Sequence, residues 1–111
     1  MEEEYQKGNY VLVGGDFNQD LTGKGGKVPE GIWNPSPFPK EFLKNFTKLY
    51  HGQSPTSVVN NKPYTGKEAY LSIIDGFIVS DNIEVKNVKT IKDQDFKYSD
   101  HNPVLMEFKL K

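Results

Sequence analysis

Five side chains in three short segments of this sequence could carry chemistry. They are two aspartates beside apolar runs, an asparagine, and an adjacent aspartate and histidine: Asp16, Asn18, Asp75, Asp100 and His101. An imidazole and carboxylates can move protons near neutral pH. Carboxylate oxygens are also the ligands that hard divalent cations prefer. The residue types therefore indicate acid–base or metal-assisted chemistry, provided that the fold brings them together.

The first segment follows a predicted strand. Residues 10–13 are apolar, β-branched or aromatic and stop at two glycines, which indicates a buried strand that ends at the edge of a sheet. On an extended backbone, Asp16 and Asn18 would face one site while Phe17 turns into the core. The glycines permit an unusual φ or the close approach of a ligand. A plain polar loop after a strand remains an alternative for this segment alone.

Asp75 lies within an apolar run, 70–80, that predicts another strand. Since a buried, unpaired carboxylate loses its hydration, Asp75 must be paired, exposed at a sheet end, or functional. A structural hydrogen bond is the default interpretation for one isolated aspartate. Asp100 and His101 lie in a turn that Pro103 helps to fix, directly before a C-terminal strand. Their adjacency alone is weak evidence of function.

The remaining pattern predicts the elements that must position these side chains. Residues 2–8 resemble the last turns of a helix with a glycine cap, and 83–91 and 104–110 read as strands. A helix is predicted over 41–50, because its apolar residues have helical spacing: Phe42, Phe46, Leu49 and Tyr50. The segment 19–39 reads as a loop, in which Trp33 packs and the pair Lys24 and Lys27 is either solvated or faces a phosphate.

Composition limits the class of protein. A chain of 111 residues forms one domain at most, and its net charge of −1 argues against a module that holds nucleic acid by bulk electrostatics. It does not exclude an enzyme that meets phosphate through metal ions. Without cysteine there is no disulfide framework and no thiolate site. No stretch has membrane-spanning length and no signal peptide opens the chain. Met1 is expected to be an internal start within a longer domain.

Three motifs together, in this order, resemble the C-terminal half of the endonuclease/exonuclease/phosphatase superfamily. They are the segment 15–18, the apolar strand that carries Asp75 and ends at Ser80, and the segment 99–104. The resemblance covers residues 1–111 and implies an α/β fold. That fold is half of a DNase I-like four-layer α/β/β/α sandwich, with one mainly antiparallel sheet and one or two covering helices. It also implies metal-dependent hydrolysis of phosphodiesters or phosphomonoesters.

The resemblance implies a role for each of the five side chains. Asp16 orients or deprotonates the attacking water, and Asn18 holds that water or a phosphate oxygen. His101 contacts the scissile phosphate, and Asp75 hydrogen-bonds His101, which fixes its tautomer and raises its pKa. Asp100 approaches a divalent metal, Mg²⁺ or Mn²⁺.

The N-terminal half of the superfamily domain, with its main metal ligands, has no counterpart in this sequence. We therefore expect the parent protein to be a hydrolase, and the chain alone to bind metal weakly, to be inactive and to self-associate through uncovered apolar sheet surface. The substrate is a phosphate ester: nucleic acid, phospholipid or a small phosphoester. The alternatives are a non-catalytic binding module and a DNA-repair nuclease. Bacterial relatives, some of them secreted or anchored in a membrane by upstream residues, offer the nearest resemblance.

Overall fold

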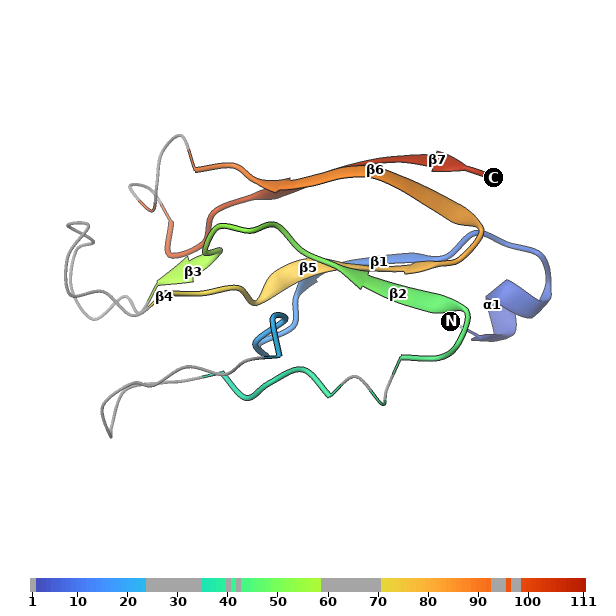
Figure 1. Cartoon of the computed structure of the whole chain (residues 1–111), viewed down its shortest axis with the longest axis horizontal. Coiled ribbons are helices and arrows are strands. Elements are labelled where there is room, and N and C mark those ends of the chain that lie inside the picture. Colours follow the sequence, from blue (N-terminus) through green and yellow to red (C-terminus); the bar gives the residue numbers. More distant parts are fainter. Residues whose placement is uncertain are drawn as a thin grey trace.

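The structure is a computed structural model that describes residues 2–23, 35–39, 41, 43–58, 71–92, 96 and 99–111. These residues form one short helix and seven strands, and the strands make up three separate antiparallel sheets (Figure 1). The elements are α1 (Glu2–Gln6), β1 (Leu12–Asp16), β2 (Thr47–Tyr50), β3 (Ser57–Val58), β4 (Leu71–Ser72), β5 (Asp75–Ser80), β6 (Ile83–Thr90) and β7 (Val104–Leu110). The sheets have the strand orders β1–β5–β2, β3–β4 and β6–β7.

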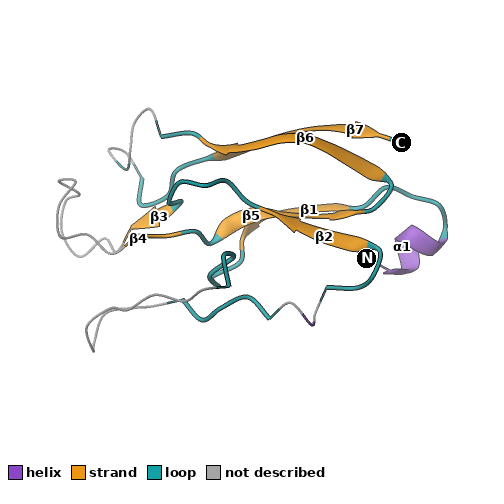
Figure 2. Cartoon of the chain, viewed as in Figure 1, coloured by secondary structure: helices purple, strands orange, loops and turns teal. Residues whose placement is uncertain are grey.

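The predicted α/β sandwich with covering helices is wrong. Among the described residues, 46% are in strand and 8% in helix, and no helix has seven or more residues (Figure 2). The single sheet of the prediction is also wrong, because the strands divide among three small sheets. No helix in the described part of the chain is long and apolar enough to cross a membrane.

A strand replaces the helix that was predicted over 41–50. Residues Thr47–Tyr50 form β2 and pair antiparallel with β5. A turn precedes β2, in which the N–H and the hydroxyl of Thr47 each donate to the carbonyl of Lys44 at 2.9 Å. Strand pairing outweighs helical spacing here, because Thr and Tyr favour strands and the apolar pattern is short. Four residues of these predictions lie outside the described residues: Lys24, Lys27, Trp33 and Phe42.

Strand β1 is exposed, whereas the sequence predicted a buried strand. It lies at the edge of its sheet, and Leu12 and Val13 are 38% and 39% exposed. Gly14 and Gly15 are accommodated in this strand for different structural reasons. A Cβ atom on Gly14 would lie 2.7 Å from two ring atoms of Phe77, and Gly15 has a φ of +149°. The expected unusual φ is confirmed, and the close approach at Gly14 is made by an aromatic ring of the protein itself.

The strand predicted over 70–80 is interrupted at Ile73 and Ile74. Strand β4 pairs with β3, whereas β5 pairs with β1 and β2. The carbonyls at the interruption accept hydrogen bonds from the N–H groups of Leu21 (2.9 Å) and Phe17 (2.8 Å). Asp75 is consequently the first residue of β5 and lies at a sheet end, although its side chain is only 17% exposed.

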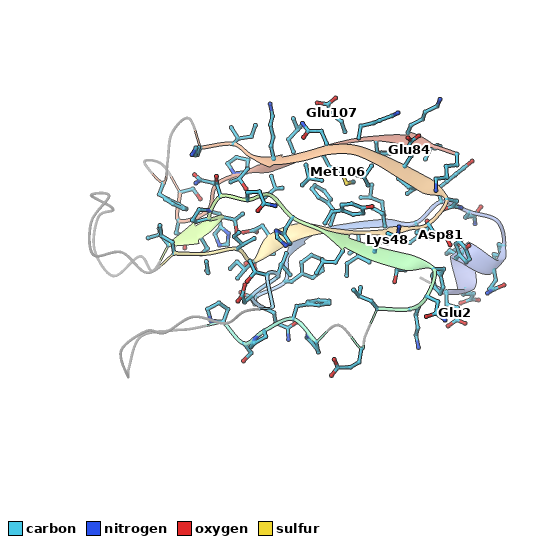
Figure 3. The ribbon with its side chains drawn as sticks, viewed as in Figure 1. Glu2, Lys48, Asp81, Glu84, Met106 and Glu107 are labelled. Carbon is cyan, nitrogen blue, oxygen red and sulfur yellow. The ribbon has the colours of Figure 1, made fainter. Side chains whose placement is uncertain are left out.

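Other local predictions are confirmed. Helix α1 ends before Gly8, which has a φ of +85°, and the strands predicted over 83–91 and 104–110 are present as β6 and β7. These two strands pair as an antiparallel hairpin. Figure 1 shows this hairpin running along the three-stranded sheet. Met106 faces that sheet and Glu107 points away from it (Figure 3). The covered face expected from Met106 onward stops there, since Phe108 and Leu110 are 47% and 48% exposed. The buried apolar side chains among the described residues are Leu21, Val58, Ile74, Val79 and Ile83.

Candidate catalytic site

The ring of His101 lies between two carboxylates. Its Nδ1 is 2.8 Å from Oδ2 of Asp75, and its Nε2 is 3.7 Å from Oδ2 of Asp16. One ligand atom of each residue lies within 4.8 Å of the others. The hydrogen bond that the resemblance implied between Asp75 and His101 is therefore present. Three of the five predicted side chains meet at one place, although they lie far apart in the sequence.

Strand pairing and a turn position these three side chains. Asp16 and Asp75 are directly opposite each other in the antiparallel pairing of β1 with β5, so both lie on the same face. His101 forms an isolated β-bridge with Ser57 of β3. Its N–H donates to Oγ of Ser99 at 3.1 Å, which tightens the turn that carries the ring. The site thus joins the end of the β1–β5 pair to the turn that bridges to β3.

Asn18 and Asp100 lie beside this group. Asn18 has a φ of +53°, so the strand ends at Asp16 and the predicted alternation does not continue to Asn18. Its backbone N–H donates to Oδ1 of Asp16 at 2.8 Å, which orients that carboxylate. Asp100 is exposed, and its carbonyl accepts from the N–H of Val58 at 3.1 Å. Its carboxylate is not among the ligand atoms that lie within 4.8 Å of one another.

The carboxylates raise the pKa of His101 above its ordinary value of 6.5. Partial burial by itself lowers this pKa, because it disfavours the charged ring. The hydrogen bond to Asp75 and the negative charges of Asp75, Asp16 and Asp100 raise it by more. The raised pKa extends to higher pH the range in which the ring is an imidazolium, a form that can stabilise an anion or donate a proton.

A pocket of about 370 Å³ adjoins the ring of His101. It is lined by Gly15, Asp75, Gly76, Phe77, Ser99, His101, Asn102, Pro103 and Val104. All nine residues lie within the three motifs, but only Asp75 and His101 were assigned roles from the sequence. The available signal was spacing: side chains two apart on a strand share a face, so Phe77 lies on the same face of β5 as Asp75.

The donor set suits a hard divalent cation only in part. Mg²⁺ is commonly held by one or two carboxylates together with waters and substrate phosphate. Asp75 already accepts the hydrogen bond of His101, whereas the side chain of Asp16 is 35% exposed and near the ring. Of the two carboxylates, that of Asp16 is therefore the more accessible to a cation. Such a cation would polarise a phosphoryl oxygen as a Lewis acid.

Comparisons with known proteins do not place the chain in a family. No family model, no curated protein and no solved structure matches the chain. The functional conclusion consequently rests on the residues and on their arrangement.

Proposed function

We propose that the native protein carrying this chain hydrolyses phosphate esters, with Mg²⁺ or Mn²⁺ as cofactor. The single observation that supports this most is the imidazole of His101, which lies between the carboxylates of Asp75 and Asp16 beside a pocket. The three motifs that resemble the endonuclease/exonuclease/phosphatase superfamily support the same reaction class. Diester and monoester substrates both remain within the proposal.

Each residue of the group has a distinct role in the proposed reaction. Asp75 accepts the Nδ1 proton of His101, which leaves Nε2 directed toward the substrate. The protonated ring stabilises the negative charge that develops on the phosphoryl oxygens. Asp16 orients the attacking water and accepts its proton as the new P–O bond forms. The bond from phosphorus to the leaving oxygen breaks, and that oxygen takes a proton from solvent water to leave as the alcohol. Asn18 holds Asp16 through its backbone N–H and contributes its amide to the water or to a phosphate oxygen.

Turnover of the native gene product tests the proposal. The protein is purified from its source cells and is assayed with a nitrophenyl phosphodiester and a nitrophenyl phosphomonoester, with Mg²⁺, with Mn²⁺ and with EDTA. We expect cation-dependent release of nitrophenol that is lost in EDTA. Strong competition by duplex DNA would identify the nuclease alternative. Absence of turnover with both esters and both cations would overturn the proposal and favour a non-catalytic binding module.

Cation binding can be measured without turnover. Mn²⁺ is paramagnetic and broadens the NMR signals of nearby nuclei, so a titration should first broaden the amide signals of Asp16 and Asp100. The signals of Glu84 and Lys86 on β6 serve as the reference, because these two residues form an exposed ion pair elsewhere. Equal broadening in both places would show that the cation has no preferred site and would contradict the assignment.

A further inference from the structure

Thr56 is a fully buried residue beside the candidate catalytic group. Its relative exposure is 0%, and it directly precedes β3. Its hydrogen bonds reach the start of β5 and the turn that carries His101. A buried threonine hydroxyl must find partners, because an unpaired polar group in the interior is costly. Here the partners are backbone groups next to the candidate catalytic residues.

The hydroxyl of Thr56 is hydrogen-bonded to the backbone where the chain passes from β4 into β5. Oγ1 accepts hydrogen bonds from the N–H of Ile74 at 3.0 Å and from the N–H of Asp75 at 3.2 Å. The hydroxyl donates to the carbonyl of Ser72 at 3.5 Å, and the N–H of Thr56 donates to the same carbonyl at 2.8 Å. One side chain therefore satisfies two N–H groups at the interruption that places Asp75 at the sheet end.

The backbone of Thr56 holds the opposite side of the site. Its carbonyl accepts from the N–H of Asn102 at 2.8 Å, directly after His101. Asn102 is 5% exposed, and its side-chain amide donates to the carbonyl of Pro55 at 3.3 Å. The carbonyls of Pro55 and Thr56 thus both accept hydrogen bonds from Asn102, the residue that follows His101.

The same network extends to the third member of the group. The N–H of Phe17, the residue after Asp16, donates to the carbonyl of Ile74 at 2.8 Å. The N–H of Ile74 in turn donates to Oγ1 of Thr56. Asp75 therefore bonds to Thr56 directly. Asn102, which follows His101, also bonds to Thr56 directly. Phe17, which follows Asp16, is linked to Thr56 through Ile74.

We propose that Thr56 is a positioning residue, whose hydroxyl and carbonyl together set the separation of the Asp75 carboxylate from the His101 ring. This inference rests on the function proposed for the same site. The hydroxyl is the decisive group, because valine has the same shape but offers no acceptor to the two N–H groups. Serine retains the acceptor and lacks only the methyl group.

The test compares Thr56→Val with Thr56→Ser in the native gene product. The first readout is the downfield NMR signal of the His101 Nδ1 proton, which depends on its hydrogen bond to Asp75 and requires no turnover. We expect Thr56→Val to lose or broaden this signal and to lower kcat on the order of 10²-fold with little change in KM, because misplaced groups react slowly. Thr56→Ser should restore both. Thr47→Val is the matched control, since the Thr47 hydroxyl bonds to Lys44 away from the site.

The outcomes separate this inference from the proposed function. A folded Thr56→Val protein that keeps the Nδ1 signal overturns the positioning role, whether or not the native protein turns over phosphate esters. If the native protein has no turnover, the signal alone decides. If Thr56→Val does not fold, hydrogen exchange of the backbone amides in the unaltered protein is measured instead of the variant. Rapid exchange of the Asp75 N–H would then overturn the proposal. Loss of the signal in Thr56→Ser would do the same.

Discussion

Asp16 and Asp75 lie directly opposite each other on β1 and β5, and the ring of His101 reaches both carboxylates. Like charges that face each other across an antiparallel pair repel. When His101 is protonated, its ring offsets that repulsion, with Nδ1 at 2.8 Å and Nε2 at 3.7 Å from the two carboxylates. The electrostatics of this sheet edge and the proposed chemistry therefore depend on the same histidine.

The free energy of unfolding is expected to fall as His101 loses its proton. Since the folded pKa is raised above 6.5, the stabilising contribution is complete below that value and is lost as the pH rises through the raised pKa. Urea unfolding in EDTA between about pH 5 and about pH 9 measures this decrease. His101→Gln should remove it, and His51→Gln should retain it, because His51 bonds to the Gly52 carbonyl outside the site. An unchanged slope in His101→Gln would contradict the assignment.

Asp16→Asn is expected to have opposite effects on stability at low and at high pH. When His101 is neutral, the substitution removes repulsion from Asp75 and should stabilise the fold by about 0.2–1 kcal/mol. When His101 is charged, it removes an attraction and should be neutral or destabilising. Urea unfolding of Asp16→Asn and of the unaltered protein, at about pH 5 and at about pH 9, measures the difference in their free energies of unfolding. The same sign at both extremes would refute the coupling of the three charges.

Asp75→Asn and His101→Ala should each abolish most turnover in the native gene product without unfolding it. The expected loss is roughly 10²- to 10⁴-fold, the usual contribution of a positioned acid or base. Circular dichroism checks the fold, and Glu107→Gln is the control, because Glu107 is exposed on β7 and points away from the three-stranded sheet (Figure 3). Near-normal turnover in either site variant would exclude that residue from the reaction.

Two glycines near the site should differ in their tolerance of alanine. A Cβ atom on Gly76 would lie 2.5 Å from the backbone oxygen of Tyr50, and neighbouring backbone moves only at a cost. A Cβ atom on Gly14 meets the ring of Phe77 instead, which is a side chain beside the pocket and can shift. We expect Gly76→Ala to destabilise by about 1–3 kcal/mol and Gly14→Ala by less. Thermal unfolding measures both, and the reverse order would contradict the packing described here.

The chain alone is expected to self-associate. Strand β1 pairs with β5 on one side, and its other edge has no strand partner among the described residues. Leu12 and Val13 are exposed along this edge, and such edges recruit further strands. Light scattering should show an apparent mass of at least a dimer, and Val13→Lys should shift it toward the monomer. A monomeric unaltered chain at the same concentration would argue against the association.

Sequence patterns predicted the elements whose signals are local. The hairpin strands β6 and β7 and the glycine at the end of α1 were foreseen, because alternation and a left-handed glycine act within a few residues. The helix over 41–50 was wrong, since β2 forms by pairing with β5, which is distant in the sequence. The uninterrupted strand over 70–80 was wrong for a similar reason, because Thr56 holds the interruption from outside that segment.

The sequence by itself determined which side chains could do chemistry and which turns carry them. Asp16 and Asp75 beside apolar runs, and His101 before a strand, were recognisable from residue type and spacing. Only the tertiary structure decided that Asp16 faces Asp75, that His101 lies between them, and that Thr56 hydrogen-bonds to the backbone of Asp75 and of Asn102, the residue after His101. The physical reason is that propensity is a property of neighbouring residues, whereas strand register and buried hydrogen bonds depend on partners from distant parts of the chain.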